Sequence, residues 1–218
     1  MVIGQGWTQW KQSNTERATN VKKMILEDTW WERVEYLLSF TEPVMSMIRF
    51  ADIDHPCLGM VYDGIDSMIE LMRDVINKKE KDLEETFFKE VKSICVKQWN
   101  KMTTLLHLLA FALTPKFYSD EILSQPTRVP PYRDGEVSDG CRTALSKLFR
   151  DHAMEDLVTT EFVDFVSSSG QSVVAIRDKY TKDTHAWWYL NGHTSSHLQT
   201  LAIKLLSQVC FLIFVPTL

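Results

Sequence analysis

The residues best suited to metal chemistry in this sequence are two histidines, His193 and His197, four positions apart. On a helix this spacing places both imidazoles on one face, as in many zinc sites. A zinc site also needs further cysteine or carboxylate ligands, and none is patterned nearby. Gly192, directly before His193, indicates a turn. We therefore expect a surface or capping pair and no metal site.

Acidic side chains are the next candidates, because converging carboxylates hold the divalent cations of phosphoryl-transfer enzymes. Asp63 and Asp66 form one such pair, and Asp52 and Asp54 form another. The first pair lies on the polar side of an amphipathic helical pattern, and the chain has 29 acidic residues, so pairs arise by chance. We expect a solvated helix face at Asp63 and Asp66.

Serine nucleophiles and phosphate-binding loops have no sequence support. Residues 167–169 are serines before Gly170, but the sequence lacks the G-x-S-x-G pattern and a strand leading into it. A helix end with Gly170 as its cap explains them better. Neither glycine-rich phosphate-binding pattern occurs. We expect no catalytic residue, no metal and no cofactor.

Composition narrows the class of protein further. The chain has 218 residues, a formal net charge of -5 and a pI near 5.7, which argue against nucleic-acid binding by charge alone. The longest apolar run, 209–216, is far below the roughly 20 residues of a membrane span. Four widely spaced cysteines form neither a disulfide framework nor a zinc set, which predicts free thiols. We expect a soluble, intracellular chain without a signal peptide.

Helical periodicity dominates the N-terminal part of the chain. Residues 15–26 read as a helix, and Thr29 with Glu32 forms a capping-box pattern before a second. Thr41 before Pro43 predicts a fresh helix start. The clearest apolar stripe runs through 58–77, and a long continuous helix is expected over 83–113.

A proline-rich stretch at 125–139 is predicted to be a long loop. Helices are expected at 140–149 and 154–166, followed by apolar segments at 172–180, 185–190 and 197–215. The predicted fold is mainly α, a multi-helix bundle with little or no sheet. The expected parts are a larger helical bundle at 1–124, the loop at 125–139, a smaller helical part at 140–209 and an apolar tail at 210–218.

Several motifs occur in an order that resembles the C-terminal half of plant hAT-type transposases. They are WWERVEYLLSFTEPV at 30–44, DIDHPCLG at 52–59, QWNKM at 98–102, LHLLAFALTPKFY at 106–118, AWWYLNG at 186–192 and LQTLAIKLLSQV at 198–209. The resemblance covers nearly the whole chain. It implies the helical insertion of an RNase H-like domain, followed by the start of a dimerisation segment.

The resemblance also implies what is missing. The family cleaves DNA with two aspartates and one glutamate that hold divalent metal, and none of the three is matched in this chain. The family's zinc finger is also unmatched. At 210–218 the sequence departs from the small, serine-rich stretch that the family has there, and this apolar tail is predicted to promote aggregation.

The sequence supports two interpretations of function, each belonging to a different class of protein. The first is a non-catalytic, nuclear interaction module that binds itself or another hAT-type chain. The second is a DNA-associated transposase remnant that is active only with the missing catalytic and zinc-finger parts. The net negative charge of the chain favours the first interpretation. The predicted interface residues are Trp187, Trp188, Tyr189, Leu198, Leu201 and Leu205. Aromatic anchors beside an apolar stripe are typical of interface cores, and an intramolecular core is the alternative.

Overall fold

The computed structural model describes residues 2, 4–79, 84–126, 128–168, 170–171, 175–176, 178–179 and 182–209. The mainly α prediction is confirmed, since the described residues form helices and no named strand. An isolated bridge pairs Pro56 with Val209. The predicted aggregation-prone tail at 210–218 and most of the apolar segment at 172–180 lie outside the described residues.

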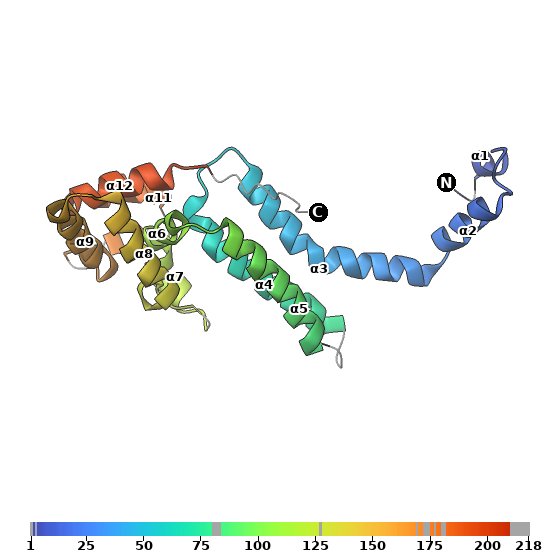
Figure 1. The fold of residues 1–218 in the computed structure, drawn as a ribbon, viewed down its shortest axis with the longest axis horizontal. Helices are drawn as coiled ribbons and strands as arrows, with labels where there is room; N and C mark the ends of the chain where they lie inside the picture. Colours follow the sequence, from blue (N-terminus) through green and yellow to red (C-terminus); the bar gives the residue numbers. More distant parts are fainter. Residues whose placement is uncertain are drawn as a thin grey trace.

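The helices form an arm and a head, with two short N-terminal helices at the far end of the arm (Figure 1). α1 (Gln5–Thr8) and α2 (Glu16–Ile25) come first. The arm contains α3 (Asp28–Asp52), α4 (Leu58–Lys79) and α5 (Glu84–Met102). The head contains α6 (Leu105–Ala112), η1 (Pro115–Tyr118), α7 (Asp120–Leu123), η2 (Pro131–Arg133), α8 (Gly135–Leu148), α9 (His152–Val166), α11 (Thr184–Asn191), η3 (Gly192–Thr194) and α12 (Ser196–Leu206).

The start of α3 differs from the predicted capping box. The helix begins at Asp28 with Glu27 as its N-cap, and the Thr29 hydroxyl donates to the Glu27 carboxylate at 3.0 Å. The fresh start predicted at Thr41 was also wrong, because α3 continues through Pro43. The Thr41 hydroxyl donates to the carbonyl of Leu37 at 2.8 Å, as it does inside a continuous helix. Figure 1 shows α3 bending near its middle, where a proline removes one helical donor.

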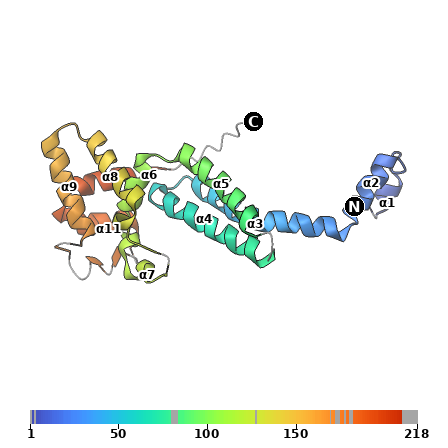
Figure 2. The same cartoon turned by 60° about the horizontal axis from the view of Figure 1, so that its bottom comes forward.

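The single helix predicted over 83–113 is two helices in the structure. α5 ends at Met102, and α6 starts after Thr104, whose backbone amide donates to Nδ1 of His107 at 3.1 Å. Burial lowers the pKa of His107, which favours the neutral imidazole that accepts this bond. The break lets α6 leave the direction of α5 and enter the head (Figure 2).

The loop predicted at 125–139 is shorter in the structure. η2 lies within it, and α8 begins at Gly135 because the Asp134 side chain accepts the amides of Glu136 and Val137, at 2.9 and 3.2 Å. The predicted division at this loop stays a prediction. Buried side chains on both sides of the loop, such as Ile69 and Val158, belong to one core cluster.

α6 is the centre of this core. Residues from His107 to Ala112 are all buried, and α6 packs against α4 and α8. Two glycines permit these close approaches. A Cβ atom at Gly59 of α4 would meet the Thr114 hydroxyl, and one at Gly140 of α8 would meet the Leu108 side chain.

Candidate functional site

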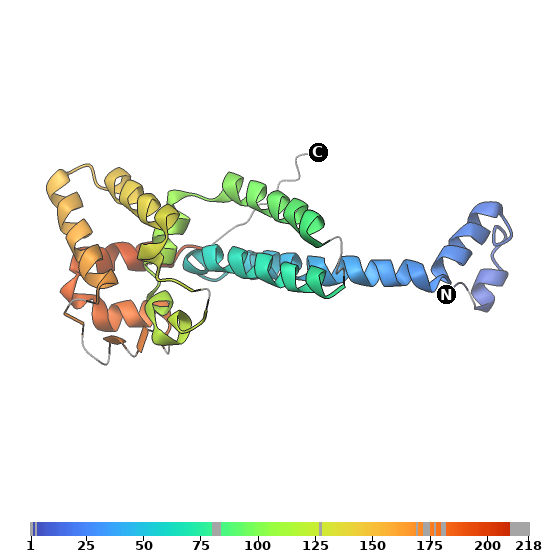
Figure 3. The same ribbon diagram turned by 90° about the horizontal axis from the view of Figure 1, so that it is seen from below.

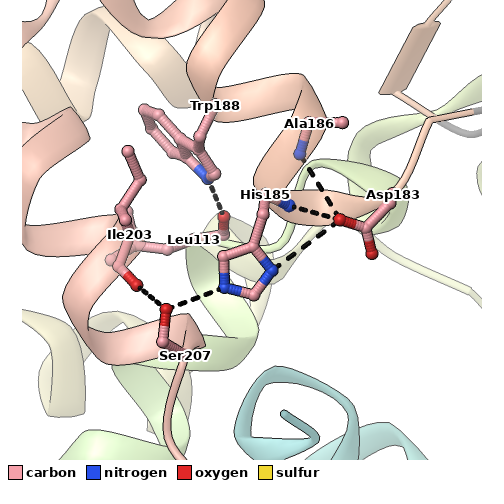
Figure 4. Close-up of polar contacts among 7 residues, drawn as sticks. All are labelled: Leu113, Asp183, His185, Ala186, Trp188, Ile203 and Ser207. Atoms are coloured by element: carbon pink, nitrogen blue, oxygen red, sulfur yellow. Dashed lines mark hydrogen bonds and ion pairs between the residues drawn. The ribbon is translucent and has the colours of Figure 1, made fainter. Parts of the chain in front are cut away.

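Four of the six predicted interface residues lie in the head core, packed within a single chain, and their assignment to an interface stays a prediction. Trp187 and Trp188 are each 1% exposed, and Leu198 and Leu205 are also buried. The physical reason is that both indoles are satisfied within the chain: Nε1 of Trp187 donates to the Ala175 carbonyl at 2.8 Å, and Nε1 of Trp188 donates to the Leu113 carbonyl at 2.9 Å. Figure 4 shows the Trp188 bond.

The other two predicted interface residues are not enclosed to the same degree. Tyr189 is 65% exposed, and Leu201 is half-buried. Phe165 of α9 lies against both tryptophans, with ring centroids 5.6 Å from Trp187 and 4.8 Å from Trp188. The intramolecular alternative therefore describes the tryptophan pair.

A serine, a histidine and an aspartate lie together beside this core (Figure 4). The histidine lies between the other two, as it does in the catalytic triad of a hydrolase. His185 Nε2 lies 3.0 Å from Ser207 Oγ, and His185 Nδ1 lies 3.7 Å from Asp183 Oδ2. The Ser207 hydroxyl also lies 2.6 Å from the Ile203 carbonyl, to which it donates. Its proton is therefore directed to the backbone, whereas a nucleophilic serine gives it to the imidazole.

The Asp183 carboxylate has a structural role in the same arrangement. It caps α11 by accepting the backbone amides of His185 and Ala186, at 3.1 and 3.4 Å. At 3.7 Å it is beyond hydrogen-bond distance of the imidazole. The three residues connect the start of α11 to the end of α12.

A second serine contacts a buried lysine that no sequence pattern indicated. Nζ of Lys179 donates to Oγ of Ser168 at 2.7 Å and lies near the rings of Tyr118 and Phe165, at 5.7 and 5.9 Å from their centroids. Burial lowers the pKa of Lys179 to about 8, and the charge of Asp120 opposes this effect. Lys179 is 1% exposed, so a substrate has no direct access to its amine.

The serine-rich stretch ends α9, as expected, although the cap differs. Ser167 is the C-cap residue, and both Ser168 and Gly170 have left-handed backbone angles, with φ of 57° and 70°. Gly170 therefore follows the cap and is not the cap itself. Ser169 lies outside the described residues.

The histidine pair is divided between two elements. His193 lies in η3, and His197 lies in α12 with its Nδ1 2.9 Å from Oε1 of Glu161. The other Glu161 oxygen accepts the Leu198 amide at 2.6 Å, so this carboxylate holds the first turn of α12 against α9. Among the residues that the structure describes, no group of three or more metal-ligating side chains occurs.

Asp66 is exposed, as expected for a solvated helix face, whereas Asp63 is half-buried. The Asp63 carboxylate pairs with the Arg128 guanidinium, which also donates to Oγ of Ser67 at 3.1 Å. Partial desolvation raises the pKa of Asp66, while the Arg128 charge lowers it. Arg128 thereby fastens the proline-rich segment to α4. In the other pair, Asp52 and Asp54 are exposed.

An apolar groove of about 270 Å³ lies in the arm, and we call it the arm groove. Its lining residues come from α3, α4 and α5, and α4 packs against each of the other two helices. Figure 3 shows these three helices in the arm. Its lining residues are Phe40, Val44, Met47, Ile48, Ile65, Met68, Met72, Val91, Ile94, Cys95, Gln98 and Met102. Eleven of these twelve side chains are apolar or weakly polar, and four are methionines. Such a groove can bind an apolar helix face, because methionine side chains adapt to different shapes.

Helical periodicity predicts that α3, α4 and α5 each have an apolar face, but it does not predict the groove between them, because it does not show how far apart the helices lie. Ile94 shows the consequence. It belongs to the stripe of α5, yet it is 62% exposed at the edge of the groove.

None of the described helices is long and apolar enough to cross a membrane. Comparison with protein-family models, with curated proteins and with solved structures finds no match to this chain.

Proposed function

We propose that this chain is a helical protein-association module that binds the apolar face of an amphipathic helix in the arm groove. The observation that carries the proposal is the groove itself, an open apolar channel between α3 and α5. A helix satisfies most of its backbone hydrogen bonds internally, so binding its apolar face would bury apolar side chains and leave few polar groups unpaired.

The resemblance to hAT-type transposases supports a related partner. On this basis the module binds itself or another hAT-type chain, acts in the nucleus and has no catalytic role. Direct contact with DNA has less support, since the chain carries a net charge of -5.

A peptide titration tests the groove. The probe is a dye-labelled, idealised amphipathic peptide with leucines on one face and alternating glutamate and lysine on the other. We expect saturable binding, measured by fluorescence anisotropy, and an affinity loss of at least about tenfold in Ile94→Glu, because the new carboxylate would be desolvated beneath the peptide.

Leu190→Glu is the matched control, because Leu190 and Ile94 are both 62% exposed and Leu190 lies on α11 in the head. This variant should bind the peptide like the parent chain. Equal losses in the two variants, or no binding by the parent at concentrations at which it is monomeric, would contradict the proposal.

A further inference from the structure

We propose that the amphipathic helix bound by the arm groove is α3 of a second copy of this chain, lying antiparallel to α3 of the first; this inference rests on the proposed function. α3 carries an apolar stripe at alternating steps of four and three residues, the spacing of a coiled-coil seam. The stripe consists of Trp30, Val34, Leu37, Thr41, Val44 and Ile48. Three further apolar residues at steps of seven widen it along one edge: Trp31, Leu38 and Met45.

The first half of this stripe lies on a helix that projects beyond the rest of the arm. All three views show α3 extending past α4 and α5 towards α2 (Figures 1 to 3). Leu37 is 53% exposed and Leu38 is 60% exposed. A projecting helical segment with bulky apolar side chains in water is marginally stable alone, and packing of its apolar face stabilises it.

The stripe of one α3 matches the stripe of a second α3 that runs in the opposite direction. With Ser39 at the centre, an antiparallel copy places Trp30 opposite Ile48, Val34 opposite Val44, and Leu37 opposite Thr41. Leu38 lies next to the centre, so the two copies of Leu38 meet close to the axis. A twofold axis produces this kind of pairing, in which each copy offers the same surface to the other.

The same register carries the exposed half of one α3 onto the groove of the other. Val44 and Ile48 belong both to the stripe and to the groove wall. Val34 and Trp30 of the second copy therefore come to lie over the groove, next to the exposed Ile94 on its other wall. One symmetric contact would cover the groove and the projecting stripe of both copies. This reciprocal fit identifies a second copy as the occupant.

Sedimentation equilibrium of the full chain over a range of concentrations tests the association. We expect the mass to rise from the 25.3 kDa of one chain to twice that value. Leu38→Glu places like charges near the axis and should weaken the dimer at least about hundredfold. Ser39→Glu adds the same charge one residue away, on the opposite face of α3, and should leave dimerisation unchanged.

Cysteine crosslinking tests the direction of pairing. Cys95 is a free thiol in the groove, and Cys210 is in the C-terminal tail, so both are first replaced by serine. In this background, mild oxidation should crosslink the Leu38→Cys dimer efficiently, because the two introduced thiols meet near the axis. Trp31→Cys should not crosslink to itself, since an antiparallel partner places Met45 nearest to it. A parallel pairing would crosslink both variants and would overturn the antiparallel arrangement.

Other outcomes separate this inference from the proposed function. A chain that stays monomeric, or a dimer that Leu38→Glu does not weaken, overturns the inference. The peptide titration, repeated with Leu38→Glu, then examines the groove without competition from a second copy. Peptide binding by that variant would leave the proposed function standing, whereas its absence would remove both.

Discussion

Lys179→Met should stabilise the fold at neutral pH, because it removes a buried charge and keeps a side chain of similar length. Lys179 is 1% exposed, and burial lowers its pKa from 10.5 to about 8. A difference of one in pKa corresponds to about 1.4 kcal/mol, so the charged form is disfavoured in the folded chain by roughly 3 kcal/mol. Loss of the hydrogen bond to Ser168 offsets part of this gain. We expect a net increase in the free energy of unfolding of about 1–3 kcal/mol at pH 7.

The sign of the pH dependence follows from the lowered pKa. Below pH 8 both folded and unfolded chains carry the charge, so the destabilisation by Lys179 is fully present. Between pH 8 and 10.5 the folded chain releases the proton first, and the destabilisation declines as pH rises. The stability difference between Lys179→Met and the parent should therefore be largest below pH 8 and should shrink towards pH 10.5.

Urea denaturation followed by tryptophan fluorescence measures this difference at several pH values. Groups that titrate alike in parent and variant cancel from the difference. The control is Lys182→Met, since Lys182 is exposed and should show little change at any pH. A Lys179→Met chain that is less stable than the parent at pH 7, or a difference independent of pH, would refute the reasoning.

Two further substitutions test the core. Ile69→Asp should lower the free energy of unfolding by about 3–5 kcal/mol, because Ile69 is 7% exposed and the new carboxylate would be buried without a partner. An unchanged urea denaturation curve would show that this stripe of α4 is solvated. Trp188→Phe removes the bond to the Leu113 carbonyl and should cost about 1–3 kcal/mol in the same assay. Retention of full stability in Trp188→Phe would mean that water satisfies that carbonyl.

Local patterns predicted the fold class because helix formation depends on neighbours a few residues apart. The stripe from Val61 to Ile76 follows helical spacing, and α4 covers this region with its stripe buried. Thr15 caps α2 by accepting the Ala18 amide at 3.3 Å, in agreement with the expected helix over 15–26. Errors arose where distant packing decided the outcome, as at Pro43, which α3 tolerates, and at Thr103–Thr104, where the chain turns into the core.

The candidate site was harder to predict, because two apolar segments with similar sequence patterns differ in burial: one is enclosed in the core and the other is exposed. Trp187 and Trp188 lie against Phe165 and the Leu113 carbonyl, residues that are remote in sequence. Leu37 and Leu38 have the same apolar character and lie on a projecting helix.

The sequence by itself determined which segments become helices and which face of each helix is apolar, since both depend on residues within a few turns. The tertiary structure alone decided which apolar faces are covered. That outcome depends on contacts between residues far apart in the chain, such as the bond from Trp188 to Leu113 and the packing of Phe40 against Phe87, with ring centroids 5.7 Å apart. These contacts bury the tryptophans of α11 and leave the first half of α3 exposed, because helix faces are covered only where other elements of the fold reach them.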